Sequence, residues 1–392
     1  MLRAVPGAVR LGSDVLLASG RLTGARVAIV CNHASVDHAF RHIVDRLAAA
    51  EHVRLTAIFG PQHGFRSDVQ DNMVETPHGK DAARRVPVYS LYSETREPTA
   101  DMLRDVEVLV IDLQDIGARI YTYIYTMANC LRAAARHGIP VIVCDRPNPI
   151  GGAIEGASLV PGFESFVGQF PIPMRHGMTI AELAALFNDR FEIGASVEIA
   201  RMERWHRAFY ADQTGLPWVM PSPNMPTLDT AIVYPGTVLF EGTMLSEGRG
   251  TTRPFELVGV PGIDAEQCAD AMNALELPGV YFRPAAFEPT FQKHAQARCG
   301  GCQLHVIHRE EFRPVITGVA LIRTFRRLNP SSFAWRPPPY EYEKEQLPID
   351  ILAGSDVLRR QIESEMPIAD IAASWGEDEQ AFERLREPFL LY

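Results

Sequence analysis

The segment VEVLVIDLQDIGARIYTYIYTMANCLRAAARHGIPVIVCD (106–145) decides the fold class. It begins with a short apolar run that ends in Asp112 and finishes with a second such run that ends in Asp145. Between them we expect Arg119–His137 to be helical, with Gly138 as the residue at which the helix stops. Strands that are apolar throughout and are separated by a helix are typical of a parallel sheet covered on both faces.

The same rhythm continues toward the N-terminus. Short apolar strands are expected at Val27–Cys31, Val53–Phe59 and Val86–Ser90. Val36–Ala50 has apolar residues at helical spacing. The polar stretch from Gly60 to about Arg85 is expected to be a long loop. The first half of the chain is therefore predicted to be an α/β domain.

The second half has a different rhythm. Helices are expected at Asp264–Leu275 and Pro314–Arg327, and strands at Val280–Phe287 and Gln303–Arg309. This mixture predicts a smaller α+β domain. Tyr234–Thr252, rich in Gly, Thr and Glu, is the candidate link between the domains. Since 392 residues exceed one typical core, we expect two domains, residues 1–235 and 236–392.

Composition and missing motifs exclude several classes of function. The net charge of −10 (38 basic against 48 acidic residues) predicts no nucleic-acid partner. No run is apolar enough to span a membrane, and MLRAVPGAVRLGSDVLL at the N-terminus has no clear cleavage site. We therefore expect a cytoplasmic protein without a membrane partner, with a periplasmic or secreted location as the open alternative. No oligomeric state is predicted.

Cofactor chemistry also lacks sequence support. No G-x-G-x-x-G follows the first strand, and neither G-x-x-x-x-G-K-[ST] nor G-x-S-x-G occurs. The lone CxxC at Cys299 and Cys302 supplies two of the four ligands that a structural zinc site needs. We expect neither a cofactor nor a metal.

Polar side chains gather where the predicted strands end. Ligands of parallel sheets bind beyond the carboxyl ends of the strands. Helix capping explains single residues of this kind but not four strand ends together. The strand-end candidates are Asn32, Gln62, His63, Asp112, Gln114, Asp115, Asp145, Arg146 and Asn148.

Carboxylates and histidines are the remaining groups that could do chemistry. Paired carboxylates across a cleft are the apparatus of glycoside hydrolysis, in which the acid needs a raised pKa. Candidates are Asp71, Glu75, Asp112, Asp115, Asp145, Glu241, Glu247, His63, His78 and His176. A cluster of Arg119, Arg146, Arg175 and Arg249 would suit an anionic ligand, with ordinary salt bridging as the alternative. Tyr121 lies close enough to a strand end to reach the site, whereas Tyr125 is expected to pack.

Seven segments in order along the chain resemble the exo-β-N-acetylmuramidase family of the NamZ type. They are GPQHGF (60–65), DLQDIGARIYTY (112–123), DRPNPIGG (145–152), RHGMT (175–179), SPNMP (222–226), YPGT (234–237) and EGRGT (247–251). The resemblance implies a Rossmann-like N-terminal domain, a smaller C-terminal domain and a cleft between them. It also implies removal of terminal N-acetylmuramic acid from the non-reducing end of peptidoglycan fragments. The lactyl carboxylate of that sugar would give the arginines a ligand.

One departure from the family affects the catalytic assignment. The family commonly has GPEHGF, with a glutamate thought to be catalytic, where this chain has Gln62. An amide cannot act as a general acid or base. Another carboxylate, Glu75 or Asp71, could supply the function, the sugar or mechanism could differ, or the protein could bind sugar without cleaving it. A metal-dependent hydrolase using His63, His78, Asp112 and Asp115 is a further alternative.

These considerations give a set of predicted site residues. The catalytic candidates are Glu75, Asp115, Glu247 and His63. The substrate-binding candidates are Asn32, Gln62, Asp112, Gln114, Arg119, Tyr121, Asp145, Arg146, Asn148, Arg175, His176, Asn224, Glu241 and Arg249. No physical argument from the sequence places RPPPYEYEKEQLPIDILAGS (336–355) at the cleft.

Overall fold

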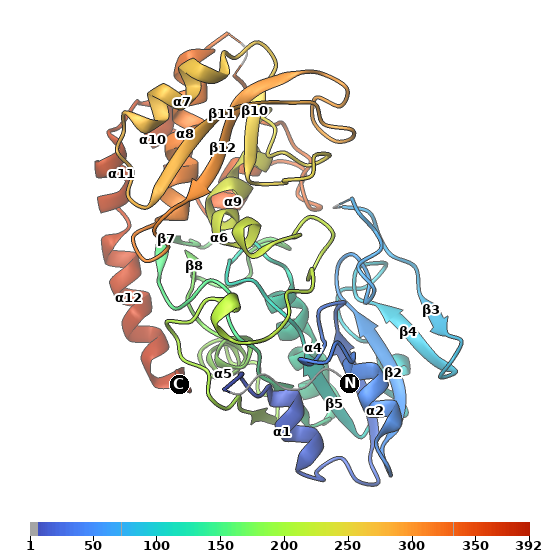
Figure 1. Ribbon diagram of the computed structural model, residues 1–392. Helices are drawn as coiled ribbons and strands as arrows, with labels where there is room; N and C mark the ends of the chain where they lie inside the picture. The colour runs from blue at the N-terminus through green and yellow to red at the C-terminus, as the bar shows by residue number, and fades with distance from the viewer. Residues whose placement is uncertain (1–6, 72, 332) are drawn as a thin grey trace.

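The apolar runs of the first half pair into one seven-stranded sheet in a computed structural model that describes residues 7–71, 73–331 and 333–392 (Figure 1). Its spatial order is β3-β4-β2-β1-β5-β6-β9, with β3 antiparallel to β4 and the other pairs parallel. The strands are β1 (Arg26–Cys31), β2 (Arg54–Gly60), β3 (Gly79–Asp81), β4 (Val86–Ser90), β5 (Val108–Asp112), β6 (Val141–Cys144) and β9 (Val197–Ala200).

The six parallel strands have the order of a doubly wound sheet. Numbered along the chain, they lie in the spatial order 3-2-1-4-5-6, so that the winding reverses between β1 and β5. Successive residues of β1 face opposite sides: Val30 packs in the larger core with α4, and Ile29 in a smaller core with α2. The predicted α/β class and Rossmann-like sheet are confirmed. The helices of this half are α1 (Gly12–Ala18), α2 (Ile43–Ala49), α3 (Ala100–Leu103), α4 (Tyr123–His137) and α5 (Ile180–Arg190).

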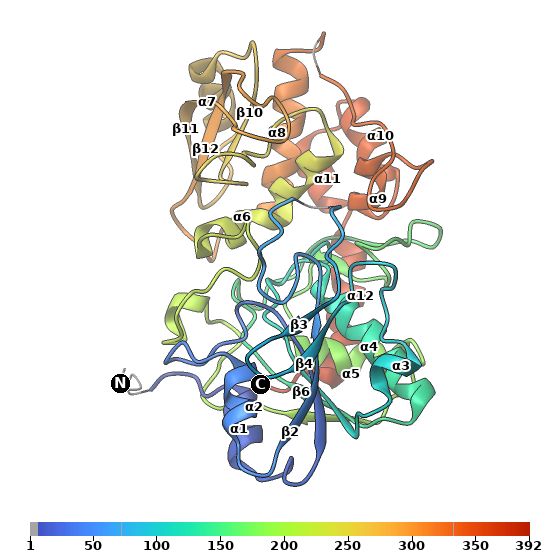
Figure 2. The same ribbon diagram turned by 90° about the vertical axis from the view of Figure 1, so that its right-hand side faces the viewer.

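The second half forms a separate lobe around a three-stranded antiparallel sheet of order β10-β12-β11 (Figure 2). Gly236 and Gly318 let α6 and α8 approach closely, since a Cβ on Gly236 would lie 1.8 Å from the Pro314 carbonyl oxygen. The elements are α6 (Leu228–Thr237), β10 (Leu257–Val260), α7 (Ala265–Asn273), β11 (Val280–Phe287), β12 (Cys299–Val306), α8 (Pro314–Leu328), α9 (Pro348–Ala353), α10 (Val357–Glu363), α11 (Ile368–Ala373) and α12 (Gly376–Arg386).

The end of the chain returns to the first lobe. α12 runs along it in Figure 1 beside the two-stranded sheet of β7 (Glu155–Ser158) and β8 (Pro173–Arg175). The Tyr392 hydroxyl donates to Asp145 Oδ2 at 2.8 Å. The C-terminal residues therefore cover the strand ends of β6 and β9, and the boundary expected after residue 235 falls inside α6.

Several sequence expectations need correction. The stretch from Gly60 to about Arg85 is not a loop throughout, because Gly79–Asp81 within it forms β3 and pairs with β4. The helix expected from Val36 begins only at Ile43, because the Asp37 carboxylate accepts backbone N–H groups of a turn that occupies the preceding residues. Tyr234–Thr252 is not a linker: it includes the end of α6 and a buried 3-10 helix, η2 (Val238–Gly242). β12 begins at Cys299 and ends at Val306, several residues earlier than expected at each end.

The predicted helix end at Gly138 is confirmed, since Gly138 ends α4 with a φ of 65°. A capping box of Thr179 and Glu182 starts α5. Within the described parts of the chain, we find no helix with the length and apolarity needed to cross a bilayer. The first six residues of the N-terminal segment lie outside the described residues.

Candidate active site

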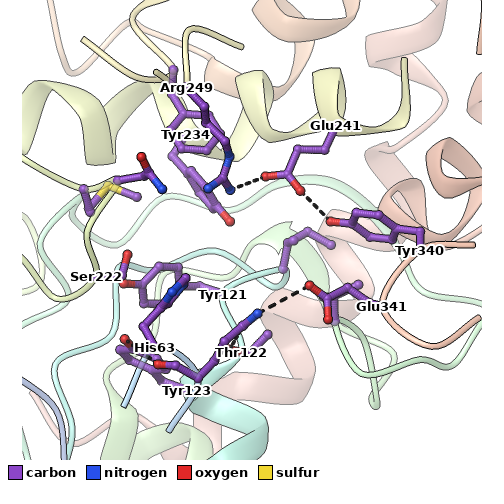
Figure 3. Close-up of a pocket in the computed structure, with 16 residues that line it drawn as sticks. His63, Tyr121, Thr122, Tyr123, Ser222, Tyr234, Glu241, Arg249, Tyr340 and Glu341 are labelled. Carbon is purple, nitrogen blue, oxygen red and sulfur yellow. Dashed lines mark hydrogen bonds and ion pairs between the residues drawn. The ribbon is translucent and has the colours of Figure 1, made fainter. Parts of the chain in front are cut away.

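A cavity lies where the carboxyl end of the parallel sheet meets the second half of the chain (Figure 3). The loops after β2 and β5 line it from one side. The end of α6, η2 and the loop before α9 line it from the other. Its polar and aromatic lining residues are Gln62, His63, Tyr121, Thr122, Tyr123, Ser222, Asn224, Tyr234, Glu241, Arg249, Phe255, Tyr340 and Glu341.

The loop after β2 brings Gln62 and His63 to the cavity through a tight turn. A Cβ on Gly60 would lie 2.5 Å from the backbone nitrogen of Phe65, and His63 has a φ of 70°. His63 Nδ1 lies 2.7 Å from the Val69 carbonyl oxygen, which can only accept, so this nitrogen carries the proton. Burial lowers the pKa of His63 to about 4, and its ring is therefore neutral at pH 7.

Gln62 is part of a hydrogen-bonded chain that ends at a glutamate. Thr122 Oγ1 donates to Gln62 Oε1 at 2.9 Å, which orients the amide so that Nε2 donates to Glu341 Oε1 at 3.4 Å (Figure 3). The other carboxyl oxygen of Glu341 accepts from the Tyr92 hydroxyl at 2.9 Å. Gln62 stands where the family commonly has a glutamate. The carboxyl that it contacts, that of Glu341, comes from the C-terminal part of the chain.

Glu341 is held in an environment that favours its protonated form. It is 4% exposed, and burial, followed by the negative charge of Glu241, raises the pKa of its carboxyl to about 7. Hydrogen bonds from Tyr92 and Gln62 and the charge of Arg249 oppose this shift without cancelling it. At neutral pH a large fraction of Glu341 therefore carries a proton that it can donate.

Glu241 has the opposite environment in the same cavity. Arg249 Nη2 lies 2.5 Å from one of its oxygens, and the Tyr340 hydroxyl donates to the other at 2.7 Å (Figure 3). Burial disfavours the charged form, but Arg249, with help from Tyr340 and Lys293, outweighs it and holds the pKa of Glu241 below its ordinary value. Glu241 thus stays anionic where Glu341 can be protonated.

Glu247 also pairs with Arg249 but does not line the cavity. Its carboxylate accepts from Lys293 Nζ at 2.8 Å and lies 3.4 Å from Arg249 Nε. The carboxylates of Glu241 and Glu247 and the cations of Arg249 and Lys293 therefore form one buried cluster whose charges cancel. Within it, Glu247 positions Arg249.

Most of the predicted strand-end residues bond to one another beneath the cavity. Arg146 Nε lies 2.6 Å from Asp112, which is fully buried. Asn32 accepts from the backbone nitrogen of Gln114 at 3.0 Å and donates to the Pro221 carbonyl at 3.2 Å. These side chains fill the point where the sheet winding reverses, and they join the strand ends to the loop before α6.

The other strand-end candidates also have protein partners. Asp145 accepts from Thr179 Oγ1 at 2.9 Å at the start of α5. Asp115 accepts a backbone N–H of its own loop at 2.7 Å and lies 3.6 Å from His176 Nε2. Asn148 and Arg175 donate to neighbouring backbone carbonyls. The cavity lining includes none of this group.

Of the four arginines predicted to cluster, Arg249 lines the cavity and the other three do not. Arg119 is completely buried and donates to backbone carbonyls from both halves of the chain. Their distances are 2.8–3.0 Å, and the acceptors are Ala157, Ile172, Leu352 and Ala353. Arg119 therefore holds the two lobes together.

The acids proposed to replace the glutamate missing at position 62 lie outside the cavity lining. Glu75 is half exposed, accepts from the Tyr342 hydroxyl at 3.2 Å and lies 3.6 Å from Arg96. Asp71 accepts from Gln292 on the surface. Among the residues that the structure describes, no three His, Cys, Asp or Glu side chains are grouped as metal ligands would be.

Six of the predicted site residues line the cavity: Gln62, His63, Tyr121, Asn224, Glu241 and Arg249. Tyr340 and Glu341, which also line it, were not predicted, and they lie in the segment 336–355 for which the sequence offered no argument. The available signal was the alternation Tyr-Glu-Tyr-Glu directly after three prolines.

Comparison with known proteins agrees with this architecture. Residues 27–229 match the model of the N-terminal domain of exo-β-N-acetylmuramidase NamZ, and residues 232–392 match its C-terminal domain. A peptidoglycan β-N-acetylmuramidase NamZ from Bacillus subtilis is 45% identical over 98% of this chain and 91% of its own length.

Two crystal structures of DUF1343 family proteins from Bacteroides fragilis share the fold. One has a TM-score of 0.89 and 33% identity over the whole of both chains. The other has a TM-score of 0.74 and 27% identity over 98% of this chain and 99% of its own.

The doubly wound domain, the smaller second lobe and the paired carboxylates between them define a two-domain α/β protein with a site of the glycosidase type. The chain belongs to the NamZ exo-β-N-acetylmuramidase family, whose two domain models together cover nearly all of it.

Proposed function

We propose that this protein is a glycosidase that releases terminal N-acetylmuramic acid from peptidoglycan fragments. The observation that carries the proposal is the pair Glu241 and Glu341, which share one cavity and have opposite charge preferences at neutral pH. Hydrolysis of a glycoside needs this division, because one carboxyl must donate a proton while another stays anionic beside the reacting carbon. Family membership and the activity named for the Bacillus subtilis relative support the same reaction.

The proposed substrates are muropeptides or muramyl disaccharides. The cavity is concave and lined by polar and aromatic side chains, as a site for one terminal sugar requires. A role in the cytoplasm, on wall fragments taken up for recycling, stays a prediction from the sequence. Fractionation of the cells that produce the protein would test it.

The deciding experiment offers the purified protein a disaccharide with N-acetylmuramic acid at its non-reducing end, with and without a chelator. We expect free N-acetylmuramic acid in both cases. The isomeric disaccharide with N-acetylglucosamine at the non-reducing end is the control and should stay intact. Binding of the first disaccharide without release would overturn the proposal and favour a carbohydrate-binding protein.

A further inference from the structure

A second and larger cavity adjoins the site on the side of Tyr92. Its wall includes Arg96, Phe166 and Tyr342. Among the residues that the structure describes, Glu341 alone lines both this cavity and the one that holds Gln62 and Glu241. The Glu341 carboxyl therefore stands at the boundary between the two cavities.

The wall of the second cavity is mostly polar and acidic, and it presents two aromatic rings, Phe166 and Tyr342, of which Tyr342 is held in place by its neighbours. The Arg96 guanidinium lies over two rings, 4.4 Å from the centroid of Tyr92 and 4.6 Å from that of Tyr342. Glu75 fixes this stack, because it accepts from Tyr342 and pairs with Arg96. Tyr342 is nonetheless 53% exposed. An immobilised ring that faces open space can pack against the C–H face of a sugar, and the surrounding polar groups can bond its hydroxyls.

We infer that the second cavity receives the leaving-group part of the glycan, and that Glu341, at the boundary, delivers the proton to the glycosidic oxygen. This inference rests on the proposed function, because it assigns places to the two parts of the same substrate. The terminal sugar then occupies the cavity of Gln62 and Glu241, and the oxygen of the bond to be broken lies beside Glu341.

The chemical step balances with water as the only co-reactant. The Glu341 hydroxyl transfers its proton to the glycosidic oxygen while the bond from that oxygen to the anomeric carbon breaks. The electron pair of that bond stays with the oxygen, which leaves as the hydroxyl of the next sugar. Water then bonds to the anomeric carbon and releases one proton, which restores the acid form of Glu341.

The groups around Glu341 leave it free to act as an acid. Glu241 and Arg249 are charged but pair with each other at 2.5 Å, so they impose little net charge on Glu341. The hydroxyl and amide groups near it are neutral at pH 7. Those that interact with it, by hydrogen bond or by charge, are Gln62, Tyr92, Tyr234 and Tyr340.

The first test compares two leaving groups. Glu341→Gln should lower kcat on the muramyl disaccharide by about 10²–10⁴-fold, the usual contribution of a general acid. On an aryl N-acetylmuraminide with a nitrophenolate leaving group, which departs without protonation, the loss should be less than about tenfold. Glu155→Gln is the matched control, because Glu155 is also buried with a raised pKa but lines neither cavity. It should leave both rates unchanged.

A double variant keeps the test informative if Glu341→Gln folds poorly. Gln62→Glu combined with Glu341→Gln exchanges the two ends of one hydrogen bond and returns a carboxyl to the first cavity, next to the boundary position 341. It should recover at least about tenfold of the lost disaccharide activity.

The second test addresses the cavity itself. Tyr342→Ala should raise KM for the disaccharide, by up to about tenfold if one ring contact is lost, and leave the inhibition constant of free N-acetylmuramic acid, which has no leaving group, unchanged. Tyr281→Ala is its control, because Tyr281 is equally exposed at 52% and lines neither cavity.

The outcomes separate the inference from the function on which it rests. If wild-type protein releases no N-acetylmuramic acid, the proposed function fails and the inference fails with it. If the wild type is active but Glu341→Gln lowers the rates on both substrates equally, or lowers neither rate, Glu341 is not the acid. If Tyr342→Ala changes KM for the disaccharide and the inhibition constant of free N-acetylmuramic acid alike, or changes neither, the second cavity is not the leaving-group site.

Discussion

Two buried carboxyl groups of this protein, those of Asp112 and Glu341, differ in what surrounds them. Asp112, at the end of β5, is bonded by the Arg146 guanidinium on both oxygens at 2.6 and 3.0 Å, and it lines neither of the two cavities described above. Glu341, in the loop before α9, has two neutral donors and open space on two sides. The difference teaches that a buried acid with a full set of charged partners stabilises the fold, whereas one with weaker compensation is available for chemistry.

The largest effect is expected when Asp112 loses its negative charge. Asp112→Asn leaves Arg146 buried without its counter-charge, so the free energy of unfolding should fall by about 3–5 kcal/mol. Urea denaturation followed by circular dichroism measures it. Adding Arg146→Met to the same variant removes the orphaned charge and should restore part of the loss. A decrease below about 1 kcal/mol in the single variant would contradict this account.

The second prediction concerns stability at Glu341. Its pKa is raised in the folded state, so the folded protein binds more protons than the unfolded chain between the ordinary glutamate pKa and about 7. Stability from this group is present at low pH and is lost as pH rises through 7. Glu341→Gln removes the effect, and relative to wild type it should gain about 3 kcal/mol between pH 4.5 and pH 8. A pH-independent difference between the two proteins would refute it.

The third prediction concerns activity. If protonated Glu341 is required, kcat/KM on the disaccharide should fall about tenfold per pH unit above a pKa near 7. The aryl glycoside, which needs no acid, should lack this alkaline limb. His63 cannot produce the limb, because its pKa of about 4 keeps it neutral throughout this range. An alkaline limb of equal size on both substrates would point to a group other than Glu341.

The sequence predicted those parts of the molecule that depend on local patterning. Apolar runs in parallel strands and Gly138 at the end of α4 each follow from short-range rules. The strand-end position of Gln62 and His63 follows from the same rules, because ligands of doubly wound sheets bind at that edge.

The part of the site that could not be predicted comes from long-range packing. Glu341 lies 279 residues after Gln62, and no local rule relates the two. The strand-end acids looked equally suitable in the sequence, because the sequence does not show that Arg146 and Thr179 already bond to them. Compensation by partners distant in the sequence decided which carboxylates face the cavity.

The smallest effect is expected at Thr179, which donates a hydrogen bond to Asp145 at the end of β6. Thr179 caps α5 by accepting from the Glu182 backbone nitrogen at 3.3 Å and also donates to Asp145 at 2.9 Å. Thr179→Ala should therefore lower the free energy of unfolding by about 1–2 kcal/mol, the upper part of the range for a lost cap. Thr99→Ala, which removes a more exposed cap from the single-turn helix α3, should cost only about 0.5 kcal/mol. Equal losses would mean that the bond to Asp145 contributes nothing, and that this carboxylate owes its place to Tyr392 and the helix N–H groups alone.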